Sequence, residues 1–133
     1  MNLDEFRISH STVMEHYQFI EIHVEGIYAA LSGKQFYIGL QDVERYSISV
    51  IIKMIQEQER RHNKTVISDS EYKELEVICL RRNFWTHDCY TELIFDRKTN
   101  APKYEADRKQ LYHDIRIARD MRELLYDKQM KVV

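Results

Sequence analysis

Apolar side chains recur every three or four residues over much of this chain, which is the spacing of one helix face. The first such stripe comprises Val13, Tyr17, Ile20, Val24, Ile27 and Leu31. Thr12 and Glu15 have the spacing of a capping box, in which side chains bond to the free backbone groups at a helix start. Gly33 suits the left-handed position just after a helix end. The pattern predicts a first helix over residues 12–31.

A second helix is predicted over residues 42–62, although its first half carries a conflicting signal. Its inner face would consist of Val43, Tyr46, Val50, Ile51, Met54 and Ile55. Residues 46–50 alternate between apolar and polar and are rich in strand formers. No turn residues bound this run and a helical pattern follows it, so helix is favoured. Residues 36–40 are expected to form a short helical turn or a loop.

The third predicted helix begins at Ser68, where Ser68 and Glu71 form another capping box. Its apolar positions are Tyr72, Leu75, Ile78, Cys79, Phe84, Trp85, Leu93, Ile94 and Phe95. This run is long for one helix, which raises the alternative of a kink near residues 82–90. Residues 97–102 contain the strongest loop signal, with Pro102 at its end.

A fourth helix is predicted over residues 104–126, followed by a frayed tail. Its stripe is Leu111, Tyr112, Ile115, Ala118, Met121 and Leu125. The 133 residues include only three Gly and one Pro, too few for the many turns of a sheet protein. We therefore predict one all-α domain over residues 1–133. The expected architecture is an up-down four-helix bundle, with room for an extra short helix or a kinked third helix.

Charge and cysteine content indicate which partners and which cellular location to expect. Residues 97–133 hold ten Lys/Arg against six Asp/Glu, so this segment could contact phosphates, although a solvated helix face is the favoured interpretation. Cys79 and Cys89 would be about 15 Å apart along one helix, too far for a disulfide. No signal peptide and no membrane-length apolar run is visible. We expect reduced thiols, a cytoplasmic location and no contact with a membrane.

Metal binding is the first chemical alternative. His16 and His23 lie seven residues apart beside the first apolar stripe, and Glu59 and His62 form one Glu-x-x-His pair. A carboxylate-bridged dimetal bundle needs such pairs on two helices with further glutamates. Because neither pair completes a ligand set, no metal and no cofactor is expected. A metal-binding bundle stays open as a minor hypothesis.

Arg82, Asn83 and His87 carry the strongest chemical signal, in the pattern Arg-Asn-x-x-x-His within the third predicted helix. This segment resembles the signature of the HEPN family, an arginine and a histidine separated by four to six residues, commonly with asparagine directly after the arginine. The same spacing occurs from Arg108 to His113, but there Lys109 follows the arginine. The predicted four-helix layout extends the resemblance over residues 12–126.

The resemblance implies a metal-independent endoribonuclease. His87 would take the proton from an RNA 2′-hydroxyl, since an imidazole titrates near working pH. Arg82 would stabilise the negative charge on the phosphorane, and Asn83 would orient the histidine or a phosphate oxygen. The products would carry 2′,3′-cyclic phosphate and 5′-hydroxyl ends.

On a straight helix, five residues correspond to roughly 140° of rotation, so one chain aims Arg82 and His87 poorly at one phosphorus. The family's answer is a homodimer through the third helix. The resemblance also implies a toxin or defence effector, with a protein antitoxin or nucleotidyltransferase as a partner. The main alternative is a non-catalytic helical dimer acting as an interaction or regulatory module, favoured by Cys89 at a position where related toxins often carry tyrosine.

Overall fold

The computed structural model describes residues 3–89 and 101–132, and all regular structure in these residues is helical. Its elements are α1 (Leu3–Leu31), α2 (Phe36–Val43), α3 (Ile48–Arg61), α4 (Asp69–Asn83), the π-helical turn η1 (Phe84–Asp88) and α5 (Ala101–Val132). The all-α prediction is therefore confirmed for the described part of the chain. None of the helices there has the length and apolar character needed to cross a membrane.

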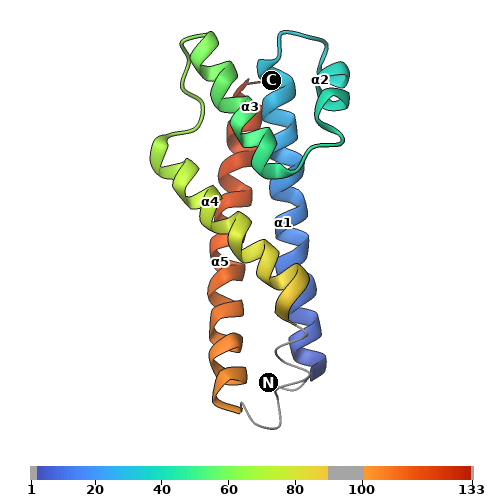
Figure 1. Ribbon diagram of the computed structural model, residues 1–133, viewed down its shortest axis with the longest axis vertical. Coiled ribbons are helices and arrows are strands. Elements are labelled where there is room, and N and C mark those ends of the chain that lie inside the picture. Colours follow the sequence, from blue (N-terminus) through green and yellow to red (C-terminus); the bar gives the residue numbers. More distant parts are fainter. Residues whose placement is uncertain (1–2, 90–100, 133) are drawn as a thin grey trace.

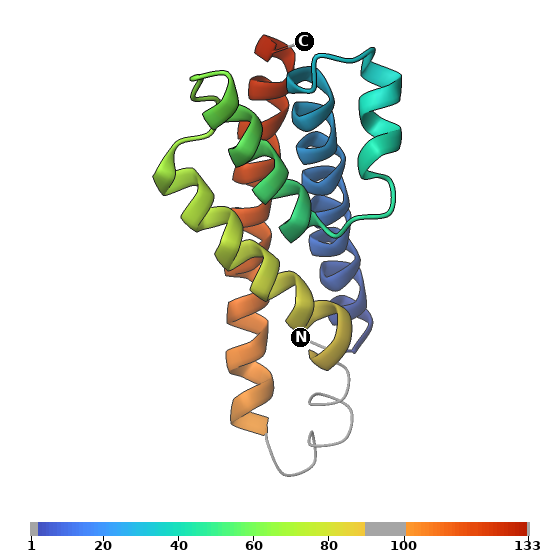
Figure 2. The same ribbon diagram turned by 45° about the horizontal axis from the view of Figure 1, so that its top comes forward.

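The long helix α1 lies at the centre of the molecule. It contacts α2, α3, α5 and η1, and α5 lies alongside it over the length of the molecule (Figure 1). The segment formed by α4 and η1 crosses this pair obliquely, and α2 packs beside the upper part of α1 (Figure 2). The lower end of the molecule therefore brings together the start of α1, the end of η1 and the start of α5.

The helix directions differ from those of a four-helix up-down bundle. His16 bonds to Arg122 at 3.3 Å and His23 bonds to Gln129 at 2.8 Å, so both helices advance by seven residues in the same direction. In an up-down bundle of four helices, the first and last helices are antiparallel. The extra short helix α2 reverses the chain once more, and this additional reversal makes α1 and α5 parallel (Figure 1).

The core follows the predicted apolar stripes on α1 and α5 closely. All six predicted positions on α1 are buried, as are Leu111, Ala118, Met121 and Leu125 on α5. Tyr112 is an exception, because it is 44% exposed. Gly26 leaves room for the amide end of the Gln129 side chain, which a Cβ atom there would meet at 2.3 Å. Parallel packing of α1 on α5 thus forms the main part of the core.

The start of α1 was predicted nine residues too late. The Thr12 hydroxyl donates to the carbonyl of Ile8 within the helix and does not cap a helix start. The preceding turns are helical because they have something to pack on: Phe6 is fully buried and its ring lies 6.3 Å from that of Trp85. This contact joins residues 79 positions apart and cannot be read from local spacing.

The predicted helix over residues 42–62 is in fact two helices. The chain breaks between Val43 and Ile48, with Ser47 in the N-cap position of α3. Tyr46 and Val50, predicted to be internal, are 50% and 41% exposed, so the alternating run that conflicted with the helix pattern marks a break. Residues 36–40 form most of α2, whose Gly39 sits against the backbone of Ala29.

Later boundaries follow the sequence more closely. The capping box at Ser68 and Glu71 is confirmed, with bonds in both directions. The helix α5 continues to Val132, where a frayed tail was predicted, because Lys128 bonds to the Val66 carbonyl and Gln129 bonds to His23. Leu93, Ile94, Phe95 and residues 97–100 of the predicted loop lie outside the described residues, while Ala101 and Pro102 belong to α5.

Candidate active site at the end of α4

A buried carboxylate anchors the end of α4 to α5. Asp114 is 5% exposed, and its Oδ2 atom accepts from Arg81 Nε at 2.8 Å and from Trp85 Nε1 at 2.7 Å. Its Oδ1 atom accepts from Gln110 at 2.8 Å. The Arg81 guanidinium also lies 4.8 Å from the centre of the Phe84 ring. A buried charge is tolerated when it is paired and hydrogen-bonded, and Asp114 meets both conditions.

The helix changes its hydrogen-bond pattern immediately after this anchor. The amide of Cys89 donates to the carbonyl of Phe84, five residues back, where an α-helix would use Trp85. The Trp85 carbonyl instead accepts from His10 Nε2 at 2.7 Å and from the Cys89 thiol at 3.0 Å. The suspected irregularity near residues 82–90 is therefore a π-helical turn. Such turns are frequent at functional sites.

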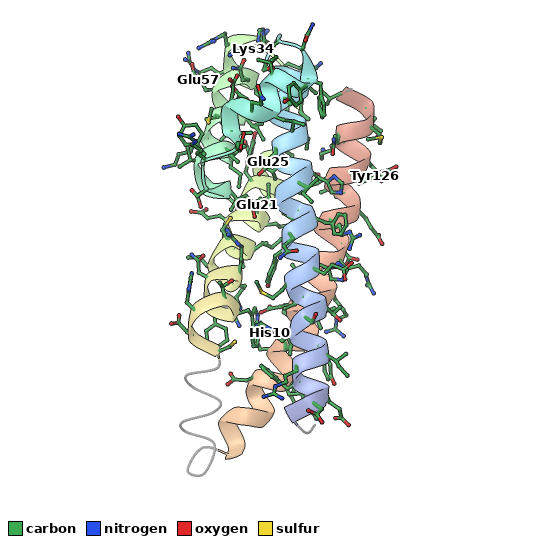
Figure 3. The ribbon with its side chains drawn as sticks, turned by 90° about the vertical axis from the view of Figure 1, so that its right-hand side faces the viewer. His10, Glu21, Glu25, Lys34, Glu57 and Tyr126 are labelled. Carbon is green, nitrogen blue, oxygen red and sulfur yellow. The ribbon has the colours of Figure 1, made fainter. Side chains whose placement is uncertain are left out.

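His10 joins this π-helical turn to the first helix. Because a carbonyl oxygen only accepts, Nε2 of His10 carries the hydrogen in the bond to Trp85. The imidazole stacks on Phe6 at 5.9 Å and meets the Trp85 ring edge-on at 6.4 Å. In Figure 3, His10 lies on the side of α1 that faces the end of the α4 segment. The backbone that carries His87 is thus held by α1 as well as by α5.

Arg82 points away from Arg81, toward α1. Its guanidinium lies 3.9 Å from a carboxylate oxygen of Glu21, and both side chains are about 30% exposed. Glu25 lies one turn further along α1, and burial together with the charge of Glu21 raises its pKa. Figure 3 shows both glutamates on α1. Two neighbouring carboxylates therefore favour a cation at Arg82, but the long distance makes the Arg82–Glu21 pair weak.

Asn83 and His87 are exposed. Neither side chain makes a hydrogen bond or ion pair with another residue in the described ranges 3–89 and 101–132. Neighbouring Thr86, also exposed, only approaches the Met14 sulfur at 3.9 Å. Two of the three predicted site residues therefore present free polar groups to solvent.

The π-helical turn also alters the angle between Arg82 and His87. A turn closed by bonds between residues five apart contains more residues than an α-helical turn. Each residue then rotates the chain by less than the 100° of an α-helix. The rotation from Arg82 to His87 is consequently smaller than the roughly 140° expected of a straight helix. The turn moves the two side chains toward a common side of the helix.

The four residues considered as metal ligands contact other side chains or the backbone. His16 and His23 face α5, where they bond to Arg122 and Gln129. Glu59 is buried and accepts from the amides of Val66 and Ile67 and from the Tyr72 hydroxyl, while exposed His62 contacts Gln58. Within the described residues, no three His, Cys, Asp or Glu side chains gather as a metal site would require.

Comparison of the sequence with protein-family models, with curated proteins and with solved structures found no match. The function of this site must therefore be inferred from its geometry and from the Arg-Asn-x-x-x-His pattern.

Sequence reasoning missed the residues that support the motif. The carboxylate partner of Arg82 is Glu21 on α1, which is distant from it in the sequence. Asp114 and His10 received no role because nothing in their local sequence marks them. One signal was available: Asp114 interrupts the apolar stripe of α5 at an inward position, and a buried carboxylate requires a donor.

Proposed function

We propose that the protein is a cytoplasmic HEPN-type endoribonuclease that cleaves RNA by attack of the 2′-hydroxyl on the adjacent phosphodiester. Its fold would be a variant of the four-helix HEPN arrangement, built from α1, α3, α4 and α5. Arg82 would stabilise the phosphorane, His87 would transfer the proton and Asn83 would orient the reacting groups. A role as a toxin or defence effector, with a protein antitoxin or nucleotidyltransferase partner, belongs to the same proposal.

The observation that carries the proposal is the different placement of two adjacent arginines. Arg81 is committed to the buried carboxylate of Asp114, whereas Arg82 has only a distant, partly exposed partner. An arginine that binds phosphate must exchange its resting partner for the ligand, which a 3.9 Å surface pair permits at little cost. Arg82 is thus both the arginine of the motif and the one of the two whose guanidinium is available to bind phosphate.

The exposed histidine supports the same reading. A general base must reach a substrate hydroxyl, and a His87 side chain that is buried or engaged could not do so. Its backbone is nevertheless held on two sides, because Trp85 bonds to both Asp114 and His10. A reactive side chain on a fixed backbone is the arrangement that catalysis needs.

Two exposed apolar side chains support dimerisation through α4. Val77 and Leu80 are 55% and 65% exposed, and both lie within two turns of Arg82. A two-fold contact on this face would bring two copies of the motif near each other and would supply a second histidine as the general acid. The same surface favours the second candidate function, a non-catalytic interaction module.

The test is cleavage of varied RNAs in excess EDTA by the wild type, Arg82→Ala and His87→Ala, with the chemistry of the product ends determined. The expected result is cyclic phosphate ends and a loss of at least about 100-fold in rate for each variant. His62→Ala is the matched control, because it removes an exposed histidine at the end of α3, away from η1.

Equal urea midpoints for all four proteins would exclude unfolding as the cause. Intact RNA at high excess of a dimeric wild type would overturn the nuclease proposal and favour the interaction module. Cleavage that survives His87→Ala would show that the site has been placed wrongly.

A further inference from the structure

A groove of about 560 Å³ runs between α4 and α5, next to the Asp114 anchor. This volume lies within the usual range of small-molecule sites, about 300–1,000 Å³. Its apolar wall is formed by Val77, Ile78, Ile117, Met121 and Leu124. Its polar lining residues are Tyr17, Glu74, Arg81, Gln110, His113, Asp114 and Asp120. Neither Arg82 nor His87 lines the groove, so its role does not depend on the proposed nuclease activity.

Tyr17 contributes a buried polar group to this groove. The side chain is 2% exposed, yet its hydroxyl makes no hydrogen bond to any residue in the described part of the chain. Burial raises its pKa, and the negative charge of Asp114, which also lines the groove, raises it further. The hydroxyl oxygen is not among the fully buried polar atoms that lack a partner in the described residues, so it keeps access to the groove, where a ligand oxygen could bond to it.

The charges around the groove favour a cation. Three carboxylates line it against one guanidinium, and Arg81 is already neutralised by Asp114 at 2.8 Å. Asp120, on α5, is contacted by Arg119 at 3.4 Å. Glu74, on α4, is exposed and makes no ion pair with any residue that the structure describes. An incoming ammonium group would therefore meet the unpaired charge of Glu74 at the rim and could share Asp120 with Arg119.

We propose that this groove binds a small organic amine with an aromatic body and a polar oxygen at its far end. The ammonium group would lie between Glu74 and Asp120, and the ring would pack on Ile117 and Met121. The polar oxygen would reach the Tyr17 hydroxyl at the buried side. This assignment goes beyond the proposed cleavage of RNA and uses none of its three site residues, although Val77 borders both the groove and the proposed dimer contact.

The test uses four related probes, titrated into the full chain by calorimetry: tyramine, phenethylamine, tyrosol and 4-hydroxyphenylacetate. They share one aromatic body and differ in the amine, in the ring oxygen and in charge. Tyramine should bind best, the neutral tyrosol should bind more weakly, and the anionic 4-hydroxyphenylacetate should bind least. Equal affinity of all four, or no saturable binding of any, would overturn the proposal.

Variants assign the two polar ends of the ligand separately. Tyr17→Phe should weaken tyramine about five- to tenfold and leave phenethylamine, which lacks the oxygen, unchanged. Glu74→Gln should weaken both amines and leave tyrosol unchanged. The matched controls are Tyr126→Phe and Glu123→Gln, which change exposed residues of α5 outside the groove. A Tyr17→Phe protein that binds tyramine as the wild type does would overturn the assignment of Tyr17.

Discussion

Arg81 and Arg82 are adjacent in sequence and occupy opposite environments. Arg81 donates to a carboxylate that is 5% exposed, within a group that also includes Trp85 and Gln110. Arg82 faces Glu21 across 3.9 Å with about a third of its side chain exposed. One residue along a helix changes the direction of a side chain by about 100°, so neighbours can serve unrelated purposes. The first arginine is held in a buried ion pair, and the second has only a long, partly exposed one.

The largest effect is expected from Asp114→Ala, which removes the carboxylate from the first of these environments. The variant leaves Arg81 and the Trp85 indole without their acceptor, and breaking a buried ion pair in this way costs about 3 kcal/mol of unfolding free energy. Urea denaturation followed by circular dichroism measures the change. Asp120→Ala is the control, because Asp120 is an exposed carboxylate on the same helix. Similar losses for the two variants would contradict the comparison.

Much smaller effects are expected from Arg82→Ala and His87→Ala. The Arg82–Glu21 pair is partly exposed and long, and such pairs contribute about 0–1 kcal/mol, while His87 has no partner in the described residues. The same denaturation experiment should therefore place both variants within about 1 kcal/mol of the wild type. A loss as large as that of Asp114→Ala would show that the second environment is also structural.

The smallest expected effect is a change in the pH dependence of stability, and it arises at the contact between α1 and α5. Arg122 donates to Nδ1 of His16, so the imidazole there must be neutral, and burial followed by the charge of Arg122 lowers the His16 pKa. A lowered pKa in the folded state means that the unfolded chain binds the proton more readily. This contribution is present above pH about 6.5 and is lost as the pH falls below it. His16→Asn should reduce the loss of stability between pH 7.5 and 5.5, and an unchanged profile would contradict this assignment.

Local pattern was sufficient where one helix supplies both partners of an interaction. The capping box of Ser68 and Glu71 and the buried stripe from Val13 to Leu31 involve spacings of three or four residues, and both were predicted. Local pattern failed where a helix boundary depends on a distant segment or where the pattern itself was ambiguous. The start of α1 depends on Trp85, and the break before α3 lies in a run whose pattern was ambiguous.

The candidate site divides in the same way. The motif residues Arg82, Asn83 and His87 could be selected from spacing alone, and their function stays a prediction until RNA cleavage is measured. The residues that hold the motif could not be selected, because His10 and Asp114 lie about 75 and 29 positions from Trp85. No periodicity links such distant positions.

The sequence by itself determined the helical class, the apolar faces of α1 and α5 and the position of the motif, because these follow from side-chain spacing along one helix. The tertiary structure decided the parallel pairing of α1 with α5, the π-helical turn over Phe84–Asp88 and the separate environments of Arg81 and Arg82. These depend on which side chains meet across helices, and that is settled only when the whole chain packs.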